Sequence, residues 1–196
     1  MTRTRKTLVT LLVLGVVGTL AGVGTFSAFS STTDNTGNTF AAGTVYIADN
    51  DAGSAMYNVT NQRPGDTTVK CIRLTYTGSL AAEVKLYTGS SVNALGGFVD
   101  LSIDKGTMPV GTTFPNCTGF VSEANVFANT LSNFTTTRNS YANGITAFPG
   151  AQTQWDQNDT VVYRFTLTLQ DNNGANGGAV ALTTGTHAFT WEARNL

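Results

Sequence analysis

The stretch TVVYRFTLTLQ, residues Thr160–Gln170, decides the fold class of this 196-residue chain. Every second side chain in it is apolar, which is the period of a β-strand that buries one face. Those apolar residues are Val161, Tyr163, Phe165, Leu167 and Leu169. The stretch therefore predicts a long, regular strand with a buried side and a polar side.

Shorter stretches before and after it also follow the strand pattern. We expect strands at Phe40–Ile47, Ala55–Thr60, Val69–Tyr76, Val84–Tyr87, Phe98–Ile103 and His187–Arg194. Turn-forming residues separate them, at Asp49–Gly53 and at Arg63–Asp66, where Pro64 fixes φ and Gly65 accepts a positive φ. About eight short strands predict an all-β fold, which we take to be a single antiparallel β-sandwich, jelly-roll-like, over residues 28–196.

One stretch favours a short helix instead. Ser122 can cap its first turn, and Val126, Phe127 and Leu131 recur at helical spacing. The polar residues that follow, Ser132–Gly144, are expected to form a loop.

Residues 1–27 have the composition of an export signal peptide. A basic start, Arg3-Thr-Arg5-Lys6, precedes an apolar run and then small residues. Thr25 and Ser27 suit the −3 and −1 sites of a signal peptidase, so cleavage would leave a mature chain that begins at Ala28. The alternative is an uncleaved anchor, because Leu8–Phe26 spans 19 residues and is just long enough to cross a bilayer.

The charge of the chain argues against a nucleic-acid partner. Charged residues make up 12% of it, against roughly 25% in an average soluble domain. Eleven basic and twelve acidic residues give a net charge of −1; without the three basic residues of the leader, eight face twelve and the balance is −4. No basic cluster remains to neutralise phosphates. Contact with a membrane is expected only through the signal peptide.

The two cysteines, Cys71 and Cys117, form an even pair in a chain marked for export. A disulfide is the expected state in an oxidising compartment, and two buried free thiols are the alternative. Neither cysteine has a C-x-x-C partner, and the chain has one histidine, His187. We therefore expect neither a metal site nor a cofactor.

Several motifs along the chain resemble the TasA/camelysin family of secreted bacterial proteins. They lie at both ends and in the middle of the sequence: Gly24-Thr-Phe-Ser-Ala-Phe29, Asn38-Thr-Phe-Ala-Ala-Gly-Thr-Val45, Pro64-Gly-Asp66, Thr77-Gly-Ser-Leu80, Val84-Lys-Leu-Tyr87 and Phe189-Thr-Trp-Glu-Ala193. Each motif is weak alone, but their order makes the resemblance moderately specific. The chain departs from the family by its cysteine pair and by a shorter region between Ser102 and Thr160.

The resemblance implies a secreted subunit of an extracellular matrix fibre or surface layer. A dedicated signal peptidase would process it, and the chain itself would be its partner in a head-to-tail homopolymer. In such fibres one subunit's N-terminal segment completes a sheet of the next. Here that segment is Ala28–Thr39, and Phe29 and Phe40 bracket it as apolar plugs.

The sequence favours a structural role over catalysis. It has no H-E-x-x-H motif for zinc hydrolysis and no G-x-S-x-G elbow for a nucleophile. Two acidic loops, Asp49–Asp51 and Asp171–Asn173, suit either calcium or plain turns, and we favour turns. The alternative function is a monomeric surface- or polysaccharide-binding module, for which Trp155, in a polar run, is the aromatic contact to test.

Overall fold

The computed structural model describes residues 41–172 and 182–196, together with Arg5, Thr7, Val9, Leu11, Leu12, Gly174 and Asn176, which are helical. The chain forms two compact units, Met1–Ala41 and Ala42–Leu196. The predicted cleavage between Ser27 and Ala28, and the segment Ala28–Thr39 with its flanking Phe40, lie outside the described residues. No helix within the described part is long and apolar enough to span a membrane.

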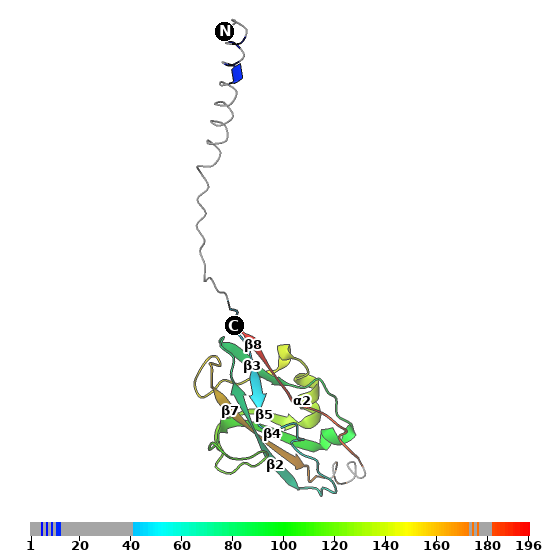
Figure 1. Cartoon of the computed structure of the whole chain (residues 1–196). Helices are drawn as coiled ribbons and strands as arrows, with labels where there is room; N and C mark the ends of the chain where they lie inside the picture. The colour runs from blue at the N-terminus through cyan, green and yellow to red at the C-terminus, as the bar shows by residue number, and fades with distance from the viewer. Residues whose placement is uncertain are drawn as a thin grey trace. The chain divides into compact units, whose positions relative to one another are not determined.

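The unit Ala42–Leu196 is an antiparallel β-sandwich, which confirms the predicted fold class. One sheet has the strand order β1-β2-β7-β4-β5 and the other has the order β6-β3-β8. The strands are β1 (Ile47–Asp49), β2 (Thr67–Tyr76), β3 (Ala82–Tyr87), β4 (Val99–Thr107), β5 (Val121–Thr130), β6 (Ile145–Thr146), β7 (Thr160–Leu169) and β8 (Thr190–Asn195). The chain crosses between the sheets at most connections, so each sheet is built from segments far apart in sequence (Figure 1).

Strand β7, the stretch from which the fold class was predicted, lies in the middle of the larger sheet. It pairs with β2 on one side and with β4 on the other, both antiparallel. All five of its alternating apolar residues are buried, as predicted. Phe165 of β7 packs on Trp191 of β8 with 6.1 Å between ring centroids, so the core lies between the two sheets.

The predicted helix from Ser122 is wrong. Residues Val121–Thr130 form β5, which pairs with β4 along its whole length. The helix, α2 (Leu131–Thr137), begins at the last residue of the predicted helix and continues into the expected polar loop, Ser132–Gly144. Its cap is Thr130, whose side-chain oxygen accepts a hydrogen bond from the amide of Asn133 at 3.1 Å. Leu131 and Phe134, one turn apart, are its buried residues.

Two predicted strands at the start of the domain are also wrong. Residues 41–46 form no strand, and β1 begins only at Ile47. Thr44 nevertheless lies along the following turn, because its carbonyl accepts from the amides of Ser79 and Leu80. Residues 55–60 are irregular, and the last strand starts at Thr190, three residues later than expected.

The turn at Arg63–Asp66 forms as predicted. The Asp66 amide donates to the Arg63 carbonyl at 2.9 Å, and Gly65 has a φ of 88°, which favours glycine. Short helical turns, η1 (Ala94–Phe98) and η2 (Tyr141–Asn143), complete the domain.

The expected disulfide between Cys71 and Cys117 is present, with 5.2 Å between the Cα atoms. Cys71 lies on β2, whereas Cys117 lies in the connection between β4 and β5. That connection folds back over the larger sheet. We call residues 108–120 the strap.

Candidate functional site

A cavity of about 1050 Å³ lies between the two sheets. Its floor is apolar and comes from both layers of the sandwich: Ile72, Val99, Leu131, Leu167, Leu169 and Trp191. Its rim consists of two irregular segments, residues 54–62 and 182–189. The cavity is therefore an unfilled part of the core that opens at one side.

The unequal width of the two sheets accounts for this cavity. Five strands form one sheet, but only three of the described strands form the other. Strand β8 is an edge of the smaller sheet and pairs with β3 alone among the described strands. Trp191 of β8 packs over Tyr163 and Phe165 of β7, so the adjoining strand β2 has no described strand opposite it.

The backbone of β8 offers hydrogen bonds on this open side. The Leu196 amide donates to Ala81, just before β3. Because backbone groups of alternate residues point to opposite sides of a strand, Trp191, Ala193 and Asn195 direct their N–H and C=O groups away from β3. The register of β8 with β3 is continuous from Thr190 to Asn195. β8 is thus a six-residue regular edge next to an apolar cavity.

The other sheet edges are poor templates for pairing. Strands β1 and β6 have three and two residues. Strand β5 is longer, but its register with β4 shifts between Ile103 and Asp104 and again between Lys105 and Gly106. Short and bulged edges discourage the addition of another strand.

Residues 55–62 cover the cavity, and we call them the lid. Within the described part of the chain, no backbone hydrogen bond joins the lid to another residue. Met56 and Tyr57 are half-buried and pack against the core. A segment held by few side chains and without backbone bonds has low local stability. Among the described residues, displacement of the lid would therefore break mainly the packing of Met56 and Tyr57.

One hydrogen bond joins the lid to the opposite rim. The Tyr57 hydroxyl lies 2.5 Å from Nε2 of His187, and Nδ1 of His187 lies 3.1 Å from the Gly185 carbonyl. This network assigns the ring proton to Nδ1, so that Nε2 accepts from Tyr57. Burial raises the pKa of the Tyr57 phenol, which keeps it a donor.

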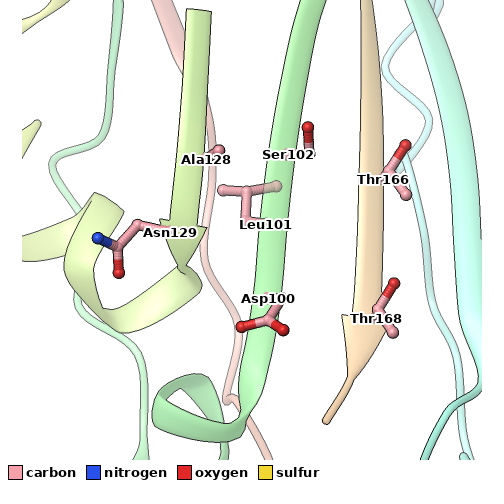
Figure 2. A pocket seen from close by; sticks show the side chains of 7 residues that line it. All are labelled: Asp100, Leu101, Ser102, Ala128, Asn129, Thr166 and Thr168. Carbon is pink, nitrogen blue, oxygen red and sulfur yellow. The ribbon is translucent and has the colours of Figure 1, made fainter. Parts of the chain in front are cut away.

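A second, smaller hollow of about 300 Å³ lies on the face of the larger sheet turned away from the core. Figure 2 shows Asp100 and Ser102 of β4 beside Thr166 and Thr168 of β7. These side chains bond to neighbours on the sheet; Thr168, for example, lies 2.9 Å from the Thr67 hydroxyl. The hollow is shallow, its lining combines Leu101 and Ala128 with these polar residues, and it has no cluster of charges.

The side chains considered as metal ligands do not come together. Among the described residues, no three His, Cys, Asp or Glu side chains form a group that could hold an ion. Both ring nitrogens of His187 have protein partners. Asp49 and Asp51 accept hydrogen bonds from the amides of Asp51 and Gly53, as a turn requires. The described residues therefore do not fit a metal of a peptidase.

The structure corrects the hypothesis that Trp155 contacts a sugar. This side chain is fully buried, and its indole N–H donates to the Ala147 carbonyl at 2.8 Å. Its backbone also pairs with Ala82 on β3. Trp155 is a core residue, in spite of its polar neighbours in sequence.

The sequence did not identify the lid or the cavity. Tyr57 and Met56 occur in a stretch that alternates weakly, which led to the incorrect strand there. The available signal was the polar composition after Tyr57, with Asn58, Thr60 and Asn61 close together. Figure 1 places strands β2 and β7, which supply part of the cavity floor, side by side in the larger sheet.

A comparison with protein families matches residues 4–182 to the model of the camelysin metallo-endopeptidase family. No curated protein matches the chain. The match extends over most of the 196 residues, including every element of the sandwich except β8. The chain belongs to the camelysin family, as its resemblance to TasA and camelysin indicated.

Proposed function

We propose that this protein is an exported structural subunit of an extracellular matrix fibre or surface layer, and that its copies assemble by strand exchange. In this proposal the N-terminal segment of one copy, Ala28–Thr39, lies along β8 of the next copy and over the cavity. The observation that supports it most is the pairing of a regular free edge with an apolar cavity of about 1050 Å³. Strand addition uses these two features together.

The lengths of donor and acceptor are compatible. Phe40 lies eleven positions after Phe29, and an extended chain rises about 3.3 Å per residue. The donor therefore reaches about 36 Å, whereas the six residues of β8 extend over about 20 Å. One of the two Phe side chains can enter the cavity while the polar residues next to it pair with β8.

The expected energy is moderate and comes from two sources. Three residues of β8 direct backbone groups outward, which allows about six hydrogen bonds at about 0.5–1.5 kcal/mol each. Burial of one Phe side chain in the cavity adds about 1.5–3 kcal/mol. The donor must displace the lid, which has no described backbone bonds of its own to lose.

Export and partners follow from the same proposal. The leader, residues 1–27, directs the chain out of the cell and is removed by a dedicated signal peptidase. The working partner is another copy of the chain, and neither a cofactor nor a nucleic acid takes part. We also propose that the protein is not a protease, although the family description names a metallo-endopeptidase. Chelator-sensitive peptide cleavage by the pure protein would contradict this part.

Deletion of Ala28–Asn38 tests the assembly. We expect a folded monomer with its disulfide intact and no filaments in electron micrographs. A synthetic peptide of residues 28–40 should then bind and slow hydrogen exchange at the amides of Trp191 and Ala193. A peptide with alanine in place of Phe29 and Phe40 is the matched control and should bind more weakly. Filaments from the truncated chain would overturn the proposal.

A further inference from the structure

The outer side of β2 is a further strand edge of the domain, and a loop rather than a strand covers it. Strand β1 pairs with β2 only from Leu74 to Tyr76. Residues 67–73 of β2 therefore have no strand partner on that side. These residues, TTVKCIR, are rich in β-branched side chains and lack proline, so they suit edge-to-edge pairing.

Two bonds occupy the middle of this edge without adding a strand. The Arg73 amide donates to the side-chain oxygen of Asn50 at 2.8 Å. The Cys71 amide donates to the Pro115 carbonyl of the strap at 3.0 Å. A proline carbonyl can accept, but proline has no N–H with which to continue a ladder. The strap therefore covers β2 and does not create a new edge in its place.

The strap is fixed at several points along its path over the sheet. Its main anchor is the disulfide between Cys117 and the fully buried Cys71. The guanidinium of Arg73 donates to the carbonyls of Met108 and Pro109 at 2.8 and 2.6 Å. The strap and the sheet also share a small apolar cluster. It consists of Cys71, Met108 and Val162, with Cys117 and Phe120 packed against them.

A cation–π contact holds the end of the strap. The Phe120 ring lies 4.7 Å from the Arg164 guanidinium, which is itself paired with Asp104 at 2.8 Å. Arg164 is on β7, between β4 and β2. The strap thus crosses the outer face of β7 to reach the edge of β2.

We propose that the strap guards β2, and that without it two copies of the chain pair through their β2 edges. A second copy is the expected occupant. Two β2 edges placed antiparallel offer each other the same outward N–H and C=O groups of residues 67–73, so the contact is self-complementary. The next outward-facing residue along this edge is Val69, whose side chain is 44% exposed. Its amide has the same orientation as those of Cys71 and Arg73, and no backbone group among the described residues accepts from it.

The test uses the full mature chain with Cys71→Ala and Cys117→Ala together. We expect the native chain to exchange the Val69 amide quickly at every concentration and the Cys71 amide slowly. In the double variant, β2-linked dimers should form, and exchange at Val69 should slow at least tenfold as concentration rises. Exchange at Trp191 and Ala193 reports strand addition at β8 separately, so failure of the proposed function can be distinguished.

Val69→Pro identifies the edge involved. Because the Val69 amide points away from β7, proline there removes an edge donor without removing a bond to β7. Added to the double variant, it should abolish the dimers, whereas the control Val69→Thr should not. Dimers that survive Val69→Pro, or a folded double variant that stays monomeric with fast exchange at Val69, would overturn the proposal. If the double variant does not fold, Arg73→Ala takes its place. In that variant the Cys71 amide should exchange at least tenfold faster than in the native chain, and dimers should form that Val69→Pro abolishes. A folded monomer with a fast-exchanging Cys71 amide would overturn the proposal.

Discussion

Strands β2 and β8 each have one side on which the described strands do not pair along their full length, but different segments lie next to the two edges. The edge of β2 is covered by a strap fixed by a disulfide, two hydrogen bonds from Arg73 and an aromatic contact. The edge of β8 lies beside a cavity under a lid that has no described backbone hydrogen bonds. The difference lies in the connections, because both strands are regular and pair fully on their other side. In the described part of the chain, the edge of β2 is therefore covered, whereas no strand lies on the outer side of β8.

The largest effect is expected from proline at position 193. The Ala193 amide points away from β3, so Ala193→Pro should leave the β3–β8 ladder intact and remove a donor that an incoming strand needs. We expect complete loss of filaments in electron micrographs, with a folded monomer by circular dichroism. Ala193→Val keeps the amide and is the matched control. Filaments of normal length from the proline variant would show that β8 is not the acceptor.

Removal of the disulfide that fixes the strap over β2 should have the next largest effect, on the free energy of unfolding. The two cysteines are 46 residues apart. On the chain-entropy model, loss of such a cross-link lowers the free energy of unfolding by about 4 kcal/mol. Urea titrations of the native chain and of the Cys71→Ala/Cys117→Ala variant should show this difference. Equal midpoints would mean that the strap is held by its other contacts.

Parts of this comparison were accessible from sequence and parts were not. Strict alternation identified β7, and the cysteine pair was expected to form a disulfide, because both signals are local or compositional. The helix was misplaced because Val126, Phe127 and Leu131 fit helical spacing, whereas pairing with β4 decides the outcome. No local pattern shows that residues 108–120 cross β7 to reach β2, or that residues 55–62 remain outside both sheets. Those features depend on contacts between distant segments.

A smaller effect is expected from the bond that joins the lid to the opposite rim. Tyr57→Phe removes the hydroxyl that donates to His187 and keeps the ring in its half-buried site. One such bond contributes about 0.5–1.5 kcal/mol. The lid should therefore open more easily, and the peptide of residues 28–40 should bind the truncated chain about two- to tenfold more tightly. Calorimetric titration measures this, and weaker binding would indicate that Tyr57 contacts the donor itself.

The smallest effect is expected on the free energy of unfolding at low pH, through Glu192 of β8. The Arg194 and Tyr87 side chains donate to the Glu192 carboxylate at 2.7 Å each. These bonds hold the pKa of Glu192 below its usual value. A lowered pKa in the folded state means that the contribution is complete above the unfolded pKa of about 4.3 and is lost as the pH falls through the folded one. Arg194 is exposed, so the effect on the free energy of unfolding is small.

Urea midpoints of the native chain and of Glu192→Gln, measured between pH 7 and pH 3, test this sign. The native chain should lose slightly more stability on acidification than the variant, because the variant has no carboxylate to protonate. Exchange at the Glu192 and Arg194 amides, which face β3, should rise in parallel, whereas exchange at Val69 on β2 should not change. A variant with the same acid dependence as the native chain would show that Glu192 does not contribute to the loss.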